Sequence, residues 1–92
     1  MSAVKVRYYA NLRDITKCRE EIVAGVGNIS SLLSTLTGKY GSEFKIKLFD
    51  VNSIRENVII LVNGKNIIFS SKLETKLNDE DEVDIFPPVA GG

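Results

Sequence analysis

The chain has 92 residues, with 12 lysines and arginines against 12 aspartates and glutamates, so its formal net charge is zero. This length fits one domain, and a composition that is 43% hydrophobic and 26% charged is typical of a globular protein and too apolar for a disordered one. The balanced charge argues against nucleic acid as the main partner, because phosphate binding requires an excess of lysine and arginine.

The first half of the chain predicts two strands followed by one helix. Apolar and polar residues alternate over 4–10, the period-2 pattern of a strand, and the polar segment 11–17 predicts a turn. Residues 20–24 can return as the antiparallel partner, and the glycines that follow end that strand. Asn28 suits a helix N-cap, and apolar residues spaced three and four apart predict an amphipathic helix over 29–40.

The second half of the chain predicts further strands without another helix. Segment 42–57 is interpreted as a short edge strand and a loop, because apolar residues alternate with lysines over 44–48. Residues 58–62 are continuously apolar and rich in β-branched side chains, which predicts a buried strand. Residues 67–69 predict a short strand, and residues 83–86 predict the last one.

This order of elements predicts an α+β fold. The first and last strands can pair in parallel at the centre of a mixed sheet, with the one main helix packed on one face. A doubly wound α/β fold would need a helix between most strands. We expect one domain over residues 1–86 and a flexible C-terminal tail over residues 87–92.

The absence of histidine and the single cysteine, Cys18, limit the chemistry of the chain. They exclude a histidine-based triad or metal site, a thiolate zinc cluster and an intramolecular disulfide, so we predict no bound metal. No apolar run is long enough to cross a membrane and no signal peptide is visible, so we expect a cytoplasmic protein without membrane contact. Another protein is expected to complete any chemistry in which the chain takes part.

The tail is suited to insertion into the active site of another protein. Gly91 and Gly92 have no side chains, so the terminal carboxylate sits on a thin and open stalk. Pro87 and Pro88 restrict the φ angle and favour an extended backbone that projects this stalk from the domain. A frayed terminus is the simpler interpretation. However, a side chain at either glycine would block a tunnel that admits only backbone.

Residues 82–92, with the sequence EVDIFPPVAGG, closely resemble the C-terminus of the small subunit of molybdopterin synthase. That family consists of ubiquitin-like sulfur carriers with a β-grasp fold. Residues 4–13 resemble its first strand and turn, and residues 61–64 resemble its central strand and turn. The resemblance implies a ubiquitin-like β-grasp domain. The family often has glycine where Glu80 stands, so a positive φ angle there would strain the backbone of this chain.

The resemblance also implies a function for the terminal carboxylate. A ubiquitin-activating-type adenylyltransferase would use ATP to adenylate Gly92, and sulfur would then replace AMP to give a thiocarboxylate. The tail would insert into the large subunit of molybdopterin synthase and donate sulfur to cyclic pyranopterin monophosphate, in a heterotetramer. The chain would bind no cofactor of its own and would not be an enzyme by itself.

Two alternatives share the same tail. One is a ubiquitin-like modifier whose Gly92 is conjugated to lysines of target proteins, and the other is a sulfur carrier for thiamine or another thio-product. The residues before the glycines favour the molybdenum-cofactor branch. The sequence leaves open the loading state of Gly92, molybdenum against tungsten in the product, and the role of segment 42–57.

Two aromatic residues are predicted interface anchors beside the tail. Parity places Phe86 with Asp84 on one face of the last strand, and Tyr9 with Lys5 and Arg7 on one face of the first strand. If the two strands are neighbours, Tyr9 and Phe86 form one exposed apolar patch, which Ile67 or Ile68 could extend. The simpler alternative is that each ring covers the sheet edge. The predicted partner-binding set is Tyr9, Phe86, Pro87, Pro88, Val89 and Ala90.

Three further features are interpreted without a binding role. The acidic run 79–82 is taken as a solvated turn rather than a docking site. Gly25 and Gly27 do not form a dinucleotide-binding loop, because Ser30 stands where the third glycine belongs and no βαβ unit surrounds them. Cys18 is taken as an incidental thiol, although Lys17 and Arg19 could activate it.

Overall fold

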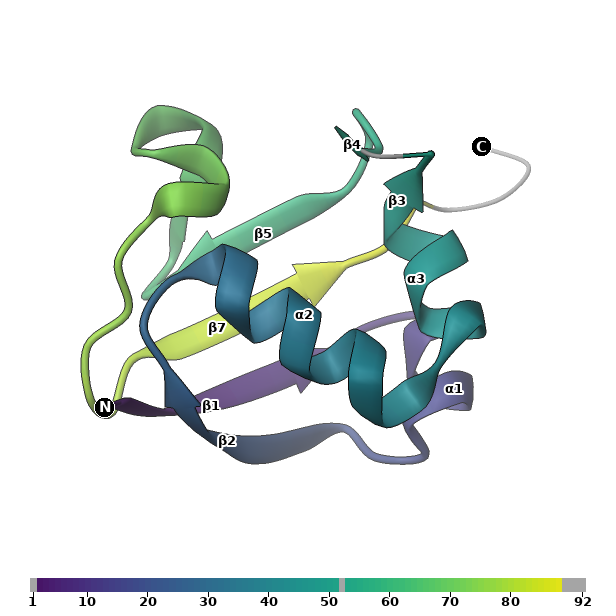
Figure 1. The fold of residues 1–92 in the computed structure, drawn as a ribbon, viewed down its shortest axis with the longest axis horizontal. Coiled ribbons are helices and arrows are strands. Elements are labelled where there is room, and N and C mark those ends of the chain that lie inside the picture. The colour runs from purple at the N-terminus through teal and green to yellow at the C-terminus, as the bar shows by residue number, and fades with distance from the viewer. Residues whose placement is uncertain (1, 52, 89–92) are drawn as a thin grey trace.

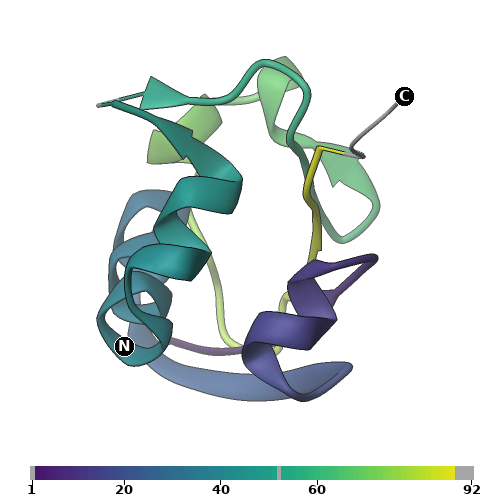
Figure 2. The ribbon, with the colours of Figure 1, turned by 90° about the vertical axis from the view of Figure 1, so that its right-hand side faces the viewer.

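A computed structural model describes residues 2–51 and 53–88. In these residues no helix is long and apolar enough to cross a membrane. Figure 1 shows a sheet with α2 lying across one face, and Figure 2 shows α2 and α3 together on one side with β7 on the other. The elements in chain order are β1 (Ser2–Tyr8), α1 (Leu12–Thr16), β2 (Glu20–Val26), α2 (Ile29–Tyr40), α3 (Ser42–Leu48), β3 (Phe49–Asp50), β4 (Ser53–Ile54), β5 (Ile59–Val62), β6 (Lys65–Asn66), the 3₁₀ helices η1 (Ile67–Phe69) and η2 (Lys72–Glu74), and β7 (Glu82–Phe86).

The main sheet has five strands in the order β2-β1-β7-β5-β6. The first and last strands, β1 and β7, pair in parallel at its centre, with Tyr8 opposite Ile85. The other pairs in this sheet are antiparallel, and β3 and β4 form a separate hairpin. The predicted α+β class, with a mixed sheet and one main helix on one face, is therefore confirmed.

The core lies between the sheet and α2, and the sequence pattern of each element puts its apolar side chains there. In β1 every second side chain points toward the helix, and in α2 the buried side chains recur at spacings of three and four. The side chains of Tyr8 and Phe44 close one end of the core with an edge-to-face contact at 6.4 Å between ring centroids. The fully enclosed residues include Val4, Val6, Tyr8, Ile29, Leu32, Leu36, Phe44, Leu48 and Ile85, each 0% exposed.

The start of α2 has the cap that the sequence predicts. The Asn28 side chain accepts a hydrogen bond from the Ser31 backbone N–H at 2.8 Å, and the Ser31 hydroxyl accepts one from the Asn28 N–H at 3.2 Å. This reciprocal capping box satisfies two backbone donors that the helix itself leaves free. At the other end Gly41 has a φ angle of +85°, a conformation that favours glycine.

A carboxylate on β2 ties this helix to the sheet. Glu21 accepts hydrogen bonds from the hydroxyl of Tyr8 at 2.5 Å and from the hydroxyl of Tyr40. The Lys39 ammonium lies 2.6 Å from the same carboxylate. Burial by itself would raise the pKa of Glu21, but the bonds from Lys39, Tyr40 and Tyr8 outweigh it and lower the pKa.

Segment 42–48 is the helix α3, so the predicted edge strand there is wrong. Phe44 and Leu48 are both fully buried, whereas Ile46 between them is 62% exposed. Residues four apart lie on one face of a helix, so this spacing decides which side chains are buried. The alternation with lysines is compatible with the period of a strand and with that of a helix. The segment is a helix because this conformation brings the side chains of Phe44 and Leu48 into the core together.

Three other expectations need correction. The segment predicted as a turn over 11–17 contains the short helix α1, which buries Leu12 and Thr16. The segment predicted as a strand over 67–69 is the helix η1, whose first turn is capped by the Asn66 side chain. The predicted buried strand is β5, but only its second residue is fully buried, and Ile59 is 45% exposed because it faces away from α2.

Strand β2 continues through Gly25, the first of the two glycines that were predicted to end it, and ends at Val26 before Gly27. Ala3 pairs with Ala24 and Ser2 pairs with Val26, so Gly25 is an extra residue in β2. Its φ angle is +79°, which fits a β-bulge with glycine in the left-handed conformation. The bulge keeps the strand paired up to the loop before α2.

The turn before β7 has the positive φ angle that the sequence suggested. Glu80 adopts a φ angle of +71°, and its backbone N–H donates to the Ala3 carbonyl at 2.9 Å. The neighbouring Asp79 carboxylate accepts a hydrogen bond from the Ala3 N–H at 2.9 Å. The turn therefore fastens the start of β7 to β1 at the cost of a strained residue.

Replacement of Glu80 by glycine is expected to stabilise the domain. Glycine adopts this conformation without a Cβ penalty, so Glu80→Gly should raise the free energy of unfolding by up to about 1 kcal/mol in urea denaturation. The matched control Asp79→Gly loses the bond to Ala3 and should lower stability. A lower stability for Glu80→Gly than for the parent chain would contradict this prediction.

Candidate functional site

The predicted tail begins where the two central strands end together. Because β1 and β7 are parallel, Tyr9 follows β1 at the end of the sheet where Phe86 closes β7. Figure 1 shows α1 and α3 at this same end. Pro87 is buried and Pro88 is half-buried, so the first tail residues pack against the domain. The predicted site residues Val89, Ala90, Gly91 and Gly92 lie outside the described residues.

The structure brings Tyr9 and Phe86 together beside this exit. Their rings are stacked, with centroids 4.1 Å apart and an angle of 13° between the planes, and both side chains are half-buried. The alternation of side chains along the first and last strands predicted that these two rings are neighbours. Ile67 does not extend the patch, because it is a core residue with 5% exposure, whereas Ile68 is 58% exposed on η1. The role of the stacked pair in partner binding remains a prediction.

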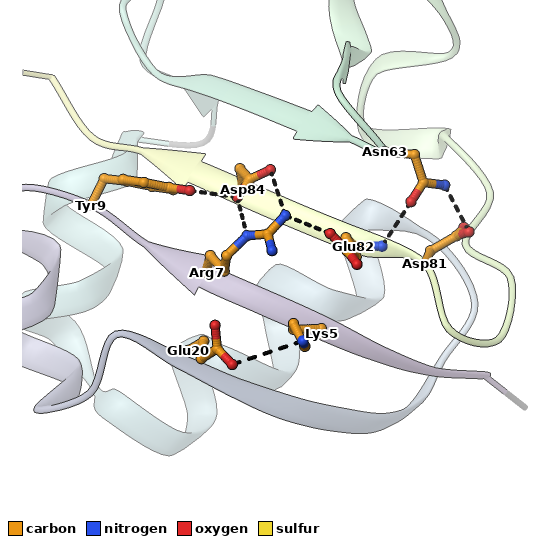
Figure 3. Close-up of polar contacts among 8 residues, drawn as sticks. All are labelled: Lys5, Arg7, Tyr9, Glu20, Asn63, Asp81, Glu82 and Asp84. Carbon is orange, nitrogen blue, oxygen red and sulfur yellow. Dashed lines mark hydrogen bonds and ion pairs between the residues drawn. The ribbon is translucent and has the colours of Figure 1, made fainter.

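A polar network holds the Tyr9 side chain (Figure 3). The Tyr9 hydroxyl donates to Oδ1 of Asp84 at 2.7 Å, and Nε of Arg7 donates to the same oxygen at 2.7 Å. Nη2 of Arg7 donates to Oε1 of Glu82 at 2.6 Å. Asp84 is only 8% exposed, although it lies on the face of the sheet opposite α2. The network thus links β1 to β7 and includes the hydroxyl of the Tyr9 ring.

The charges in this network fix the protonation of its members. Burial by itself would raise the pKa of Asp84, but the bonds from Arg7 and then Tyr9 outweigh it and lower the pKa. The bond to Asp84 raises the pKa of the Tyr9 phenol, and the bonds to Asp84 and Glu82 raise the pKa of Arg7. At neutral pH Asp84 is therefore ionised and Tyr9 keeps the proton that it donates.

Helix α1 contributes a third contact to the Tyr9 ring. The guanidinium carbon of Arg13 lies 5.4 Å from the ring centroid, a cation–π distance, and its Nε donates to the Tyr8 carbonyl at 2.7 Å. Sequence reasoning missed Arg7, Arg13 and Asp84 as site residues. The contact between Arg7 and Asp84 could have been predicted, because parallel pairing of the first and last strands places these two residues opposite each other.

Apolar residues of β5 continue this surface beyond Phe86. Ile59 pairs with Phe86 and Leu61 pairs with Asp84, so both point to the same face of the sheet. Ile59 is 45% exposed and Leu61 is half-buried. The surface therefore combines apolar side chains near the tail with an internally paired ion network.

Three carboxylates of the acidic run 79–82, those of Asp79, Asp81 and Glu82, bond within the chain. Asp81 accepts hydrogen bonds from the Asn63 side chain and from the Asn78 N–H, at 2.9 and 2.8 Å, and Glu82 pairs with Arg7. These contacts are those of the turn that the sequence predicted. In the described part of the chain no three metal-ligating side chains gather closely enough to hold a metal ion.

Comparison with known proteins places the chain in a family. The model of the ThiS family matches residues 6–92. A protein of Archaeoglobus fulgidus, named as a candidate sulfur carrier protein, is 35% identical over 98% of this chain and 99% of its own length. The sulfur carrier protein CysO of Mycobacterium tuberculosis is 33% identical over 88% of this chain and 89% of its own length.

Solved structures agree with the fold. The small archaeal modifier protein 1 of Methanosarcina acetivorans has a TM-score of 0.86 and 36% identity, covering 100% of this chain and 98% of its own. A Pyrococcus furiosus protein, named as a candidate subunit 1 of the molybdopterin converting factor, has a TM-score of 0.74 and 26% identity, covering 97% of this chain and 100% of its own. The ubiquitin-like β-grasp fold that the resemblance implied is confirmed.

Loss of the Asp84 charge is expected to change how stability depends on pH. The folded-state pKa of Asp84 is lowered, so its ionisation stabilises the fold above the unfolded pKa, and this contribution is lost as pH falls through the folded pKa. Asp84→Asn should be less stable than the parent chain at pH 7, and the difference should shrink below about pH 4. Urea denaturation across pH measures this difference, and a gap that stays constant with pH would contradict the assignment.

Proposed function

The chain belongs to the ThiS family of ubiquitin-like sulfur carriers, and on this premise we propose that Gly92 carries sulfur as a thiocarboxylate for molybdopterin synthase. In this role the chain is the small, sulfur-donating subunit of a two-subunit sulfurtransferase. It is not an enzyme by itself. The observation that carries the proposal is that the family match runs through the Gly91-Gly92 tail to residue 92.

The first step of the proposed reaction activates a poor electrophile. A carboxylate oxygen of Gly92 attacks the α-phosphorus of ATP, held by a ubiquitin-activating-type adenylyltransferase, and pyrophosphate leaves. The resulting mixed anhydride has a good leaving group, so a sulfur nucleophile can attack the carbonyl carbon and displace AMP. Gly91 and Gly92 allow the active site to close around bare backbone.

The second step uses the thiocarboxylate as a sulfur nucleophile. The tail inserts into the large subunit of the synthase, where its sulfur passes to cyclic pyranopterin monophosphate and the large subunit supplies the acid–base residues. Tyr9 and Phe86 dock at the mouth of the pocket that receives the tail beyond Pro88, in the activating enzyme as well as in the large subunit. We expect a heterotetramer with two small subunits at its ends, working in the cytoplasm without nucleic acid or membrane.

Two relatives favour specific second candidates. The Methanosarcina acetivorans structure, at 36% identity, is named as a modifier protein, which favours conjugation of Gly92 to lysines of target proteins. CysO is named as a sulfur carrier protein, which favours a carrier that serves another thio-product. All three candidates need the same activated tail and differ in what receives the acyl group or the sulfur.

One added residue after Gly92 is expected to abolish sulfur loading. An alanine at this position moves the carboxylate beyond the reacting atoms and adds a side chain to the stalk, so no thiocarboxylate should form with the activating enzyme, ATP and a sulfur donor. Accurate intact-mass measurement detects the product. The matched control carries one added alanine at the N-terminus and should load normally. Formation of the thiocarboxylate on the C-terminally extended chain at the normal level would contradict the proposal.

The choice between the candidates is testable with the loaded chain. Thiocarboxylated chain and the large synthase subunit should convert cyclic pyranopterin monophosphate to the dithiolene product, whereas the unloaded chain should not. Failure of the loaded chain, together with peptides in cell extract that join Gly92 to lysines, would instead support the modifier. Product chromatography and peptide mass spectrometry provide the two measurements.

A further inference from the structure

We infer that Asp84, held by Arg7, is a positioning residue that fixes the Tyr9 ring flat on Phe86 before any partner binds. The stacked rings stand at the exit of the tail, so their geometry sets the docking surface at its root. This inference rests on the proposed function, because it concerns how the sulfur-carrying tail is presented. It adds a role for residues of the described strands, outside the reacting tail.

The position of Tyr9 is the first argument. Strand β1 ends at Tyr8, and Ala10 has a φ angle of +54°, so Tyr9 stands where the backbone leaves the sheet. The parity of β1 therefore gives the face on which Tyr9 lies, but the strand pairing ends at Tyr8 and does not hold the Tyr9 side chain in place. Its direction depends on side-chain contacts: the hydroxyl bond to Asp84, the stack on Phe86 and the guanidinium of Arg13.

The burial of Asp84 is the second argument. A carboxylate on the face opposite α2 is free to point into water, yet Asp84 is 8% exposed and its carboxylate meets the side chains of Tyr9 and Arg7. Its Oδ1 accepts from both the Tyr9 hydroxyl and Nε of Arg7, each at 2.7 Å. A single oxygen atom thus fixes Tyr9 relative to both central strands.

Preorganisation has a measurable consequence for association. Holding a mobile side chain still at an interface weakens binding by about 2-fold to about 12-fold, and a ring that is already held avoids this loss. Loss of the Asp84 bond should therefore raise the KM of the activating enzyme for this chain by a factor in that range. The kcat should change little, because the chemistry at Gly92 is untouched.

Three substitutions separate positioning from simple stability. Tyr9→Phe keeps the ring but loses the hydroxyl, Asp84→Ala removes the acceptor, and Asp84→Asn keeps an oxygen that can accept from Tyr9. We expect Tyr9→Phe and Asp84→Ala to raise KM to a similar extent, and Asp84→Asn to retain most of the affinity. The double variant should be no worse than either single one, because both remove the same bond.

A matched control removes a different ion pair. Lys39→Ala breaks the contact with Glu21 on β2, at 2.6 Å, and touches none of the site residues. It should lower thermal stability without changing KM. KM is measured from ATP-dependent pyrophosphate release by the activating enzyme of the source organism, with each variant checked for folding by circular dichroism.

The isolated protein provides an independent readout. In the parent chain, stacking should shift the aromatic protons of Tyr9 and Phe86 upfield in NMR spectra, and Asp84→Ala should return them toward unstructured values. Unchanged ring shifts in Asp84→Ala, or additive KM effects of Tyr9→Phe and Asp84→Ala, would overturn the inference. Absence of adenylation in the parent chain would overturn the proposed function instead, and the ring shifts would still decide the positioning role.

Discussion

The parallel pairing of β1 with β7 is the constraint on which the rest of the structure depends. It joins the first and last strands at the centre of the sheet, so both end at the same edge of the domain. Core residues on one face bind the sheet to α2, and the other face receives Arg7, Asp84 and Phe86 in register. The predicted tail thus follows a strand that is paired on both sides, beside side chains that the pairing places there.

The proposed division of labour follows from this arrangement. In the described residues, stacked rings and an ion network lie on the sheet where β7 ends. Such a chain can be passed between proteins, because partners need only recognise the surface and accept the stalk. Proteins named as a sulfur carrier and as a modifier are both found among its relatives, and the proposed arrangement would suit either role.

Local patterns predicted the parts of the fold that depend on short-range physics. The alternation in β1, the Asn28 cap and the spacing in α2 each reflect neighbouring residues, and the structure confirms them. The prediction for segment 42–48 was wrong because the spacing of Phe44, Ile46 and Leu48 is compatible with a strand and with a helix. Only packing against the rest of the core selects the helix. Tyr9 and Phe86 followed from parity, but Arg13 required α1, whose single turn is too short to show a period.

Intact-protein mass spectrometry of the chain purified from its native cells tests the central claim most directly. The account predicts that a fraction carries sulfur in place of one oxygen, localised by peptide mapping to the carboxylate of Gly92. Accurate mass separates this change from oxidation, which has nearly the same nominal mass. Sulfur found only at Cys18, or Gly92 found only in branched peptides with lysine, would contradict the claim that this chain is a sulfur carrier.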